Sequence, residues 1–254
     1  MIAMLEDIVR RAGAKAREAV LVGNVMAKGH NDFVTGADLA VNELLSRELT
    51  ALVPGSRVMS EEGDTKSPTD GTLFIIDPID GTTNLMYHLQ LSCISVGYAE
   101  DGDVKAAVVL NPFTDELFSA EKGKGAFLNG VRMQVSSDRS LEEALIGFES
   151  GITITDGRES FFGKMYQFHA MGRGVRSIGS AALDLAYVAC GRFSGCAFHY
   201  LYPWDYAAGL LLLEEAGGKL TTTAGDALDL QGRSGVVVAS NTLLHEAMLS
   251  VMSE

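Results

Sequence analysis

Residues 74–84 read FIIDPIDGTTN, and the interpretation of the whole sequence depends on this segment. The apolar run 74–76 is typical of a buried strand, and it leads directly into Asp77 and Asp80, which flank Pro78. One interpretation is a strand that ends in an ordinary turn, because Asp, Pro and Gly are common turn residues. The other is a strand that delivers two carboxylates to one point at the start of the next element. The rest of the chain decides between them.

The composition is that of a folded globular protein. The 254 residues are 47% hydrophobic, with 28 glycines and 5 prolines, which fits one large domain or two packed lobes. The net charge of −13, without a cluster of Lys and Arg, argues against a nucleic-acid partner. No membrane partner is expected either, because the apolar run 210–213 is far too short to cross a bilayer.

The cysteines and the N-terminal residues indicate a cytoplasmic location. Cys93, Cys190 and Cys196 are odd in number and stand in apolar surroundings, which is typical of reduced, buried thiols. Residues 1–15 mix charges from Glu6 onward and do not have the pattern of a signal peptide.

Periodicity and turn signals predict helices and strands that alternate in blocks. The expected helices are 4–22, 35–53, 159–170, 180–190, 204–216 and one from 242; the expected strands are 56–60, 72–77, 91–99, 104–110, 144–149, 218–223 and 235–239. The stretch 115–135 is typical of hairpins, with Asn129-Gly130 as its tightest turn. This order favours layered α/β architecture with mixed or antiparallel sheets over a strict βαβ series.

Acidic residues stand at the ends of several predicted elements. They are Asp38, Glu61 and Glu62, the pair Asp77 and Asp80, and Asp205. Taken singly, each has a structural explanation: Asp38 and Asp205 could cap helices, and Glu61 could be a solvated charge. Together they favour a site for hard cations, because Mg²⁺ prefers oxygen ligands and because bare carboxylates in one cavity would repel each other.

The residues that follow the two aspartates extend this interpretation to phosphate chemistry. Pro78 is rigid, so Asp77 and Asp80 can bracket two ions, and the Ile79 carbonyl between them can face the same cavity. Gly81 then opens a helix, whose free N–H groups and positive dipole end suit a phosphate oxygen. Metal ions, a helix start and a hydroxyl group are what attack of water on a phosphate ester requires. We therefore favour the chemical interpretation over the turn.

The sequence resembles the inositol monophosphatase family, the lithium-sensitive, magnesium-dependent sugar-phosphate phosphatases. The resemblance rests on KGHNDFVTGAD, MSEEG, FIIDPIDGTTN, RSIGSAALDLAYVACGR and PWDYAAGLLLLEEAGG, which follow the family's order over most of the chain. It implies an αβαβα sandwich that usually forms a homodimer. It also implies a single phosphatase domain, 1–254, with most metal ligands in an N-terminal lobe, 1–140, and the leaving-group side in a C-terminal lobe, 141–254.

The resemblance further implies a set of metal ligands for two to three Mg²⁺ ions per subunit. One ion would be held by Glu61, Asp77 and the Ile79 carbonyl. A second would be held by Asp77, Asp80 and Asp205, and a third, weaker ion would lie near Glu61.

For catalysis, the resemblance implies that Glu61, Thr82 and Asp38 act together. The phosphate would lie over the N–H groups of Gly81 and Thr82. The attacking water would be oriented by Thr82 and Glu61, with Asp38 supporting Thr82.

The leaving-group side departs from the family pattern. Relatives that cleave inositol phosphates usually carry a glutamate seven residues before the aspartate of the WD pair, and this sequence has Phe198 there. A phenylalanine cannot accept a hydrogen bond from a hydroxyl group, so inositol preference should be weakened or redirected. The other residues implied on this side are Asp80, Gly179, Ser180, Ala181 and Asp205.

We therefore expect a Mg²⁺-dependent phosphomonoesterase that acts on a small polyol or sugar phosphate, with a small-molecule partner only. Phe198, Tyr200 and Tyr202 have a structural explanation as strand residues of a half-buried sheet. They could instead stack on a base, which leaves a nucleotide phosphatase acting on 3′-phosphoadenosine 5′-phosphate or NADP as an alternative. A fructose-1,6-bisphosphatase is another alternative. A family member with an additional protein-interaction role is a third, although the intact metal set argues against a purely structural role.

Overall fold

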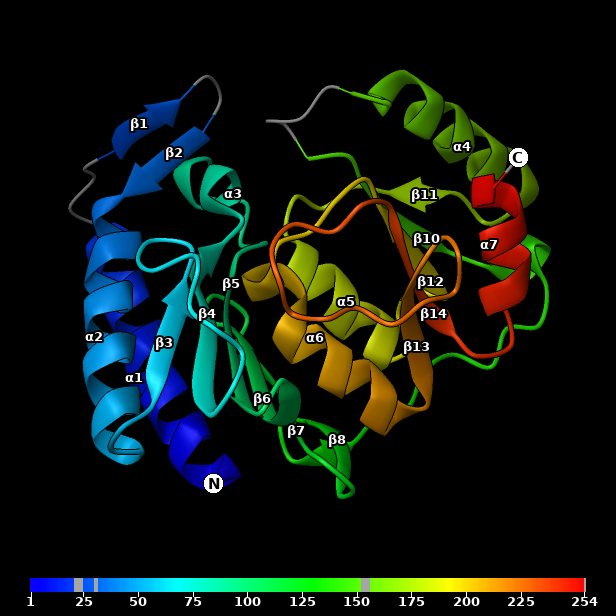
Figure 1. Ribbon diagram of the computed structural model, residues 1–254. Coiled ribbons are helices and arrows are strands. Elements are labelled where there is room, and N and C mark those ends of the chain that lie inside the picture. The colour runs from blue at the N-terminus through cyan, green and yellow to red at the C-terminus, as the bar shows by residue number, and fades with distance from the viewer. Residues whose placement is uncertain (21–24, 30–31, 152–155, 254) are drawn as a thin grey trace.

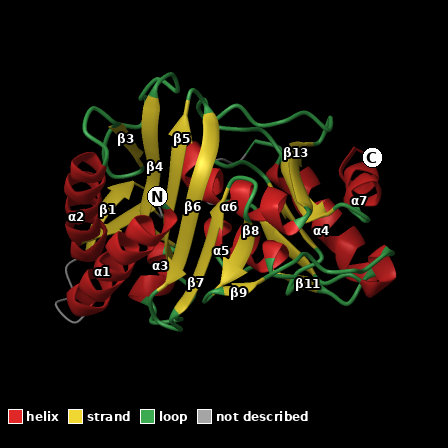
Figure 2. Cartoon of the chain, turned by 90° about the horizontal axis from the view of Figure 1, so that it is seen from below, coloured by secondary structure: helices red, strands yellow, loops and turns green. Residues whose placement is uncertain are grey.

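The structure is a computed structural model that describes residues 1–20, 25–29, 32–151 and 156–253. Helices and sheets alternate in five layers, helix, sheet, helix, sheet and helix, as Figure 1 shows from one side and Figure 2 from below. The predicted layered α/β fold with mixed sheets is confirmed.

The helices occupy the two outer layers and the middle layer. They are α1 (Ile2–Val20) and α2 (Gly36–Leu52) on one outside, α5 (Ala181–Ala189) and α6 (Pro203–Ala216) in the middle, α4 (Arg158–Met171) and α7 (His245–Ser253) on the other outside, the 3₁₀ turn η1 (Leu141–Glu143), and the short α3 (Thr82–Met86). The expected end of the first helix at residue 22 lies outside the described residues.

The larger sheet has the strand order β3-β4-β5-β6-β7-β8-β9 within the described residues. Its strands are β3 (Arg57–Ser60), β4 (Thr72–Asp80), β5 (Cys93–Glu100), β6 (Asp103–Asn111), β7 (Glu116–Glu121), β8 (Gly125–Leu128) and β9 (Val131–Arg132). β3 runs parallel to β4 and the other neighbours are antiparallel. The expected turn at Asn129-Gly130 joins β8 to β9.

The smaller sheet has the order β11-β10-β12-β14-β13 among the described strands. Its strands are β10 (Ile146–Glu149), β11 (Val175–Arg176), β12 (Gly195–Phe198), β13 (Gly218–Thr222) and β14 (Val237–Asn241), and a separate antiparallel pair is formed by β1 (Val25–Gly29) and β2 (Asp32–Thr35). β10 is parallel to both of its neighbours, and the remaining pairs are antiparallel. Both large sheets are therefore mixed.

β4 is buried on both faces, which explains its continuous apolar run. Phe74 and Ile76 belong to the core against α1 and α2, whereas Leu73 and Ile75 belong to the core that contains α5 and α6. Successive side chains of a strand alternate between faces, so Asp77 follows on the α5 and α6 side. The strand thus brings its first carboxylate to the middle layer.

A third core lies between the smaller sheet and the outer helices α4 and α7. Phe148 of β10 packs there against Phe161 of α4, with ring centroids 4.1 Å apart, and Met248 of α7 joins the same cluster. Within the described residues, every helix is too short or too polar to span a membrane. Of the cysteines expected to be buried, Cys93 and Cys196 are buried, while Cys190 is only partly buried; all three are free.

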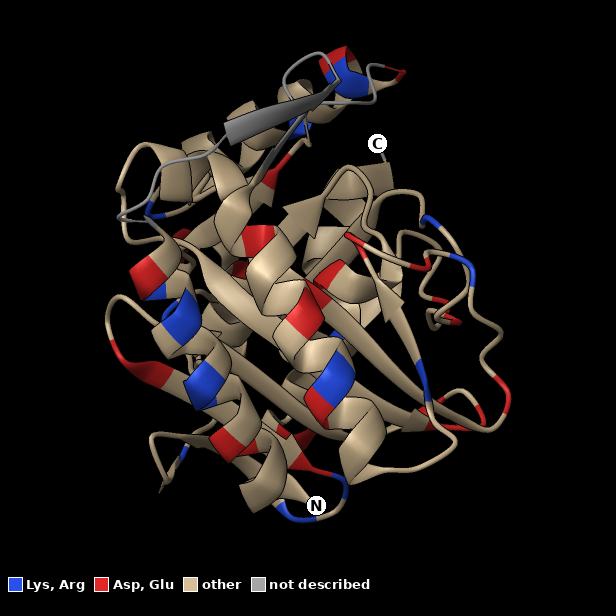
Figure 3. Ribbon diagram, turned by 90° about the vertical axis from the view of Figure 1, so that its left-hand side faces the viewer, with Lys and Arg blue, Asp and Glu red and all other residues tan. Residues whose placement is uncertain are grey.

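The outer face of α1 and α2 carries both signs of charge. Figure 3 shows Lys and Arg interspersed with Asp and Glu over these helices. Arg11, for example, pairs with Asp7 on its own helix and with Glu48 on α2. Such exposed pairs add little stability, but they keep this face from forming a basic surface for nucleic acid.

Candidate active site

The DPID segment forms a β-bulge at the end of β4. Asp77 pairs with Ser95 of β5 and Asp80 pairs with Cys93, so three steps along β4 match two steps along β5. In a regular strand, residues three apart point to opposite faces, and one extra residue brings them to the same side. Proline has no N–H to donate to a ladder, which suits Pro78 to this irregular position. The bulge therefore explains how both carboxylates reach one pocket.

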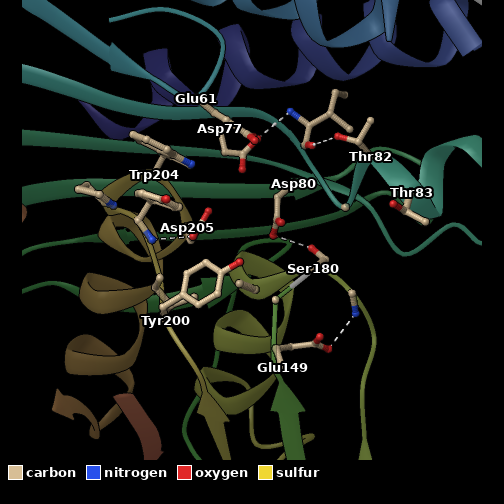
Figure 4. Close-up of a pocket in the computed structure, with 18 of the residues that line it drawn as sticks. Glu61, Asp77, Asp80, Thr82, Thr83, Glu149, Ser180, Tyr200, Trp204 and Asp205 are labelled. Atoms are coloured by element: carbon tan, nitrogen blue, oxygen red, sulfur yellow. Dashed lines mark hydrogen bonds between the residues drawn. The ribbon is translucent and has the colours of Figure 1, made fainter. Parts of the chain in front are cut away.

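That pocket has a volume of approximately 980 Å³ and lies between the end of β4 and the starts of α5 and α6. Its lining includes Glu61, Asp77, Ile79, Asp80, Gly81, Thr82, Glu149, Gly179, Ser180, Ala181, Tyr200, Tyr202 and Asp205. Figure 4 shows the labelled carboxylates on opposite walls of this space, contributed by strands of both sheets and by α6. The structure thus brings together residues that lie more than a hundred positions apart in the sequence.

Asp77 and Asp80 are each fixed by hydrogen bonds. The backbone N–H of Ile79 donates to Asp77 Oδ1 at 3.0 Å, a hydrogen bond between two residues of the bulge. Asp80 Oδ2 accepts from Ser180 Oγ and from the backbone N–H of Ala182, both at 2.7 Å. Asp80 therefore connects the end of β4 to the start of α5.

Asp205 and Glu61 reach the pocket from two other elements. Asp205 lies in the first turn of α6 and accepts from the backbone N–H of Tyr202 at 2.7 Å, so it caps the helix and lines the pocket at the same time. Glu61 follows β3 directly, and its backbone N–H donates to the carbonyl of Ile76 on β4. Glu62, its neighbour in sequence, does not line the pocket.

Asp38 lies behind Thr82, not in the pocket wall. It forms a capping box with Thr35 at the start of α2, as the structural explanation required. Its other oxygen, Oδ1, accepts from Thr82 Oγ1 at 3.1 Å, and the Ile79 carbonyl lies 3.2 Å from the same hydroxyl. A hydroxyl has one proton to donate, so Thr82 retains lone pairs that can accept from a third group. Asp38 therefore caps a helix and orients the Thr82 hydroxyl.

Gly81 begins α3 in the left-handed region, with φ +88°, and it lines the pocket with Thr82. Its carbonyl accepts from Ser92 Oγ at 2.8 Å. Asn84, one turn into α3, donates to the carbonyl of Ile178 at 2.6 Å, which ties the start of α3 to the segment before α5. The backbone at Gly81 is thus tied directly to Ser92, just before β5, and through Asn84 to the segment before α5.

The carboxylates repel one another in a buried setting. Burial raises the pKa of Asp77 well above its usual range, and the negative charges of Glu61, Asp80 and Asp205 raise it further. Burial likewise raises the pKa of Asp205 well above its usual range, with the charge of Asp80 as the next cause. An all-oxygen donor set with mutual repulsion fits a hard divalent cation. Within the described residues, no three Asp, Glu, His or Cys side chains form a group that could hold a metal ion as they stand.

Phe198 does not line the pocket, contrary to the expectation that it contacts substrate. Its side chain is fully buried in the core shared with α5 and α6, because β12 is an inner strand of the smaller sheet. Tyr200 and Tyr202, beyond the end of that strand, do line the pocket. Glu149, which sequence analysis missed, ends β10 and lines it as well. The available signal was its place at a strand end, like that of Glu61 after β3.

The pH dependence of stability should reveal the Asp80 carboxyl. Burial raises its pKa to about 6, so between about pH 4 and pH 6 the folded protein holds a proton that the unfolded chain has released. The metal-free protein is therefore expected to lose stability as pH rises through this range, by up to about 3 kcal/mol. Denaturant unfolding in EDTA between pH 4 and 7 measures the slope. Asp80→Asn should flatten it, whereas Asp70→Asn on the surface should not; equal slopes in all three proteins would contradict the assignment.

The layered fold and the oxygen-lined pocket at its centre define a phosphoric monoester hydrolase, and comparison with known proteins supports that class. The model of the inositol monophosphatase family matches residues 1–254, and the chain belongs to this family.

Relatives are similar over nearly their full lengths. The inositol-1-monophosphatase of Rhizobium meliloti is 38% identical, covering 98% of this chain and 94% of that protein. The fructose-1,6-bisphosphatase/inositol-1-monophosphatase of Thermotoga maritima is 37% identical, covering 92% and 88%. Among solved structures, the extragenic suppressor protein suhB of Bartonella henselae superposes with a TM-score of 0.90 at 31% identity, covering 99% of this chain and 98% of that chain.

Proposed function

We propose that this protein uses two to three Mg²⁺ ions to hydrolyse the phosphate monoester of a small polyol or sugar. The observation that carries the proposal is the lining of one pocket by Glu61, Asp77, Asp80 and Asp205 beside the start of α3. Family membership supports the magnesium dependence and the hydrolase class. The charge repulsion within the pocket supports the need for cations.

The residues that would hold the ions come from both lobes, 1–140 and 141–254, which we propose work as one catalytic domain. Glu61, Asp77 and the Ile79 carbonyl would hold one ion, and Asp77, Asp80 and Asp205 would hold a second, with a third near Glu61. Bound Mg²⁺ supplies Lewis-acid polarisation of the phosphate and lowers the pKa of water beside it.

The chain's own groups would bind the phosphate and orient the attacking water. The N–H groups of Gly81 and Thr82 would donate to phosphate oxygens, a use of a helix start that needs no side-chain charge. Thr82 donates its hydroxyl hydrogen toward Asp38 or the Ile79 carbonyl, so its oxygen can accept a hydrogen bond from the attacking water. The Glu61 carboxylate would be the second acceptor for that water. Together these acceptors would place the water opposite the leaving oxygen.

On the basis of family membership we also propose a homodimer, a cytoplasmic location and sensitivity to lithium. Three free cysteines among the described residues fit a reducing compartment.

Metal removal and a substrate panel test the proposed function together. EDTA treatment is expected to lower hydrolysis of inositol 1-phosphate by at least about 100-fold, because the metal ions supply several kcal/mol of transition-state stabilisation, and Mg²⁺ should restore it. The panel adds fructose 1,6-bisphosphate, histidinol phosphate, 3′-phosphoadenosine 5′-phosphate and NADP. Phosphate release should be fastest from the polyol and sugar phosphates. Faster release from both nucleotides than from every sugar phosphate would favour the nucleotide alternative, for which Tyr200 and Tyr202 offer stacking surfaces.

A further inference from the structure

Glu149 occupies the wall of the pocket opposite the bulge of β4. It is the last residue of β10 and is paired with Phe198 on the parallel strand β12. Paired residues point to the same face of a sheet, and the Phe198 side chain faces the middle layer, so Glu149 faces it as well. In Figure 4, Ser180 lies between Asp80 and Glu149. The smaller sheet therefore places a carboxylate beyond the proposed ion ligands, beside Gly179 and Ser180, which are expected on the leaving-group side.

The Glu149 carboxylate is held in a fixed orientation by the segment that precedes α5. Gly179 donates its backbone N–H to Oε1 at 2.8 Å, and Ser177 donates its hydroxyl to Oε2 at 3.1 Å. The backbone N–H of Ile178 and the Asp184 side chain also approach this carboxylate, which lines the pocket and would face a ligand there. A pre-oriented acceptor loses little entropy when a ligand hydroxyl binds.

Asp184 and Glu149 are neighbouring acidic side chains, and Glu149 is the one that carries the negative charge. Asp184 of α5 is fully buried, and its pKa is raised well above its usual range, first by burial and then by the charge of Glu149. Burial also raises the pKa of Glu149, but hydrogen bonds from Gly179 and Ser177 act against that shift because they favour its charged form. Of the two acids, Asp184 therefore keeps the proton and Glu149 remains an acceptor.

The wall around Glu149 is acidic or neutral among the described residues. It also contains Ser150, Ser177, Ser180 and Ala181. Two positive side chains lie near the pocket, but neither pairs with Glu149 within the described residues: Lys66 lines it from the loop after β3, and Arg233 lies over the Tyr200 ring, 5.6 Å from its centroid. A hydroxyl group can donate to Glu149, whereas a second phosphate group there would be repelled.

Resting on the proposed function, we infer that Glu149 determines the substrate class: it accepts hydrogen bonds from the hydroxyl groups of a neutral polyol leaving group and discriminates against leaving groups that carry a second phosphate. It is a specificity residue and takes no part in the attack on phosphorus. The inference thus narrows the proposed substrates to polyol monophosphates.

Glu149→Gln tests the inference with paired substrates. Gln keeps a carbonyl oxygen for the Gly179 N–H but replaces the other acceptor with an amide donor. The variant is expected to lose about 10- to 100-fold in kcat/KM for inositol 1-phosphate, mainly through KM, and less than about 3-fold for phenyl phosphate, which has no hydroxyl groups. The ratio of fructose 1,6-bisphosphate to inositol 1-phosphate hydrolysis should rise. Equal losses on all substrates, or no loss on inositol 1-phosphate, would overturn the inference.

Glu142→Gln is the matched control, because Glu142 of η1 is exposed and lies outside the pocket. It should retain the wild-type substrate ratios, and a change equal to that of Glu149→Gln would overturn the inference. The wild-type protein separates this failure from that of the proposed function. Active wild type with unchanged ratios in Glu149→Gln overturns the inference alone, whereas wild type without Mg²⁺-dependent hydrolysis of any ester overturns both.

Discussion

Asp77→Asn is expected to lower kcat/KM for inositol 1-phosphate by at least about 1,000-fold while making the metal-free protein more stable. Asp77 is proposed as the ligand common to two ions, so its loss removes two sources of charge stabilisation in the transition state. Without metal, however, its charge is buried and repelled by Glu61, Asp80 and Asp205. Removing that charge at neutral pH should raise the free energy of unfolding in EDTA by at least about 1 kcal/mol, because one pKa unit corresponds to about 1.4 kcal/mol.

The opposite signs of the two effects make this variant informative. The asparagine carbonyl can still accept from the Ile79 N–H, so the bulge has no reason to unfold. Wild type should gain stability on addition of Mg²⁺, and Asp77→Asn should gain much less. The control is Asp138→Asn, which removes a carboxylate that accepts from Ser194 outside the pocket. Near-normal turnover in Asp77→Asn, or an undiminished response to Mg²⁺, would contradict the assignment of Asp77 as a shared ligand.

The part of the site predicted from the sequence is the part that local motifs encode. The end of β4, the start of α3 and the first turn of α6 are each continuous in the sequence, so Asp77, Thr82 and Asp205 could be assigned to element ends by reading alone. The same holds for the helix and strand order, because hydrophobic periodicity and glycine-containing turns are local signals. These motifs could not show the bulge. Whether Asp77 and Asp80 point to the same face of the sheet depends on how β4 pairs with β5.

The leaving-group side was harder to predict because it depends on register between distant strands. β10 and β12 are separated by two helices, and only their pairing shows that Glu149 and Phe198 lie side by side. Counting from the WD pair located Phe198 in the sequence correctly, but a position in an inner strand does not reveal which way an apolar side chain packs. The short strands β1, β2 and β11 were also missed, because two to five residues are too few to show a clear hydrophobic alternation.

Gly81→Ala is expected to lower the free energy of unfolding by about 2–4 kcal/mol and kcat/KM by about 100-fold. At φ +88° a side chain is already disfavoured. The new Cβ would also lie 2.9 Å from the Leu91 carbonyl oxygen and 3.1 Å from the Gly179 carbonyl oxygen. Both are backbone oxygens that accept from Asn84 Nδ2, so neither can yield without moving the segment before β5 or the segment before α5.

Gly55→Ala separates backbone strain from crowding, because Gly55 has the same φ of +88° and no atom lies within 4 Å of the position that its new methyl group would take. This variant should lower the free energy of unfolding by only about 1 kcal/mol and leave activity unchanged. Inhibition by inorganic phosphate then tests whether Gly81→Ala loses activity because it binds phosphate less tightly. If the N–H groups of Gly81 and Thr82 bind phosphate, the inhibition constant in Gly81→Ala should rise along with the loss of kcat/KM. A destabilised variant that binds phosphate and turns over substrate as wild type does would place the phosphate elsewhere in the pocket.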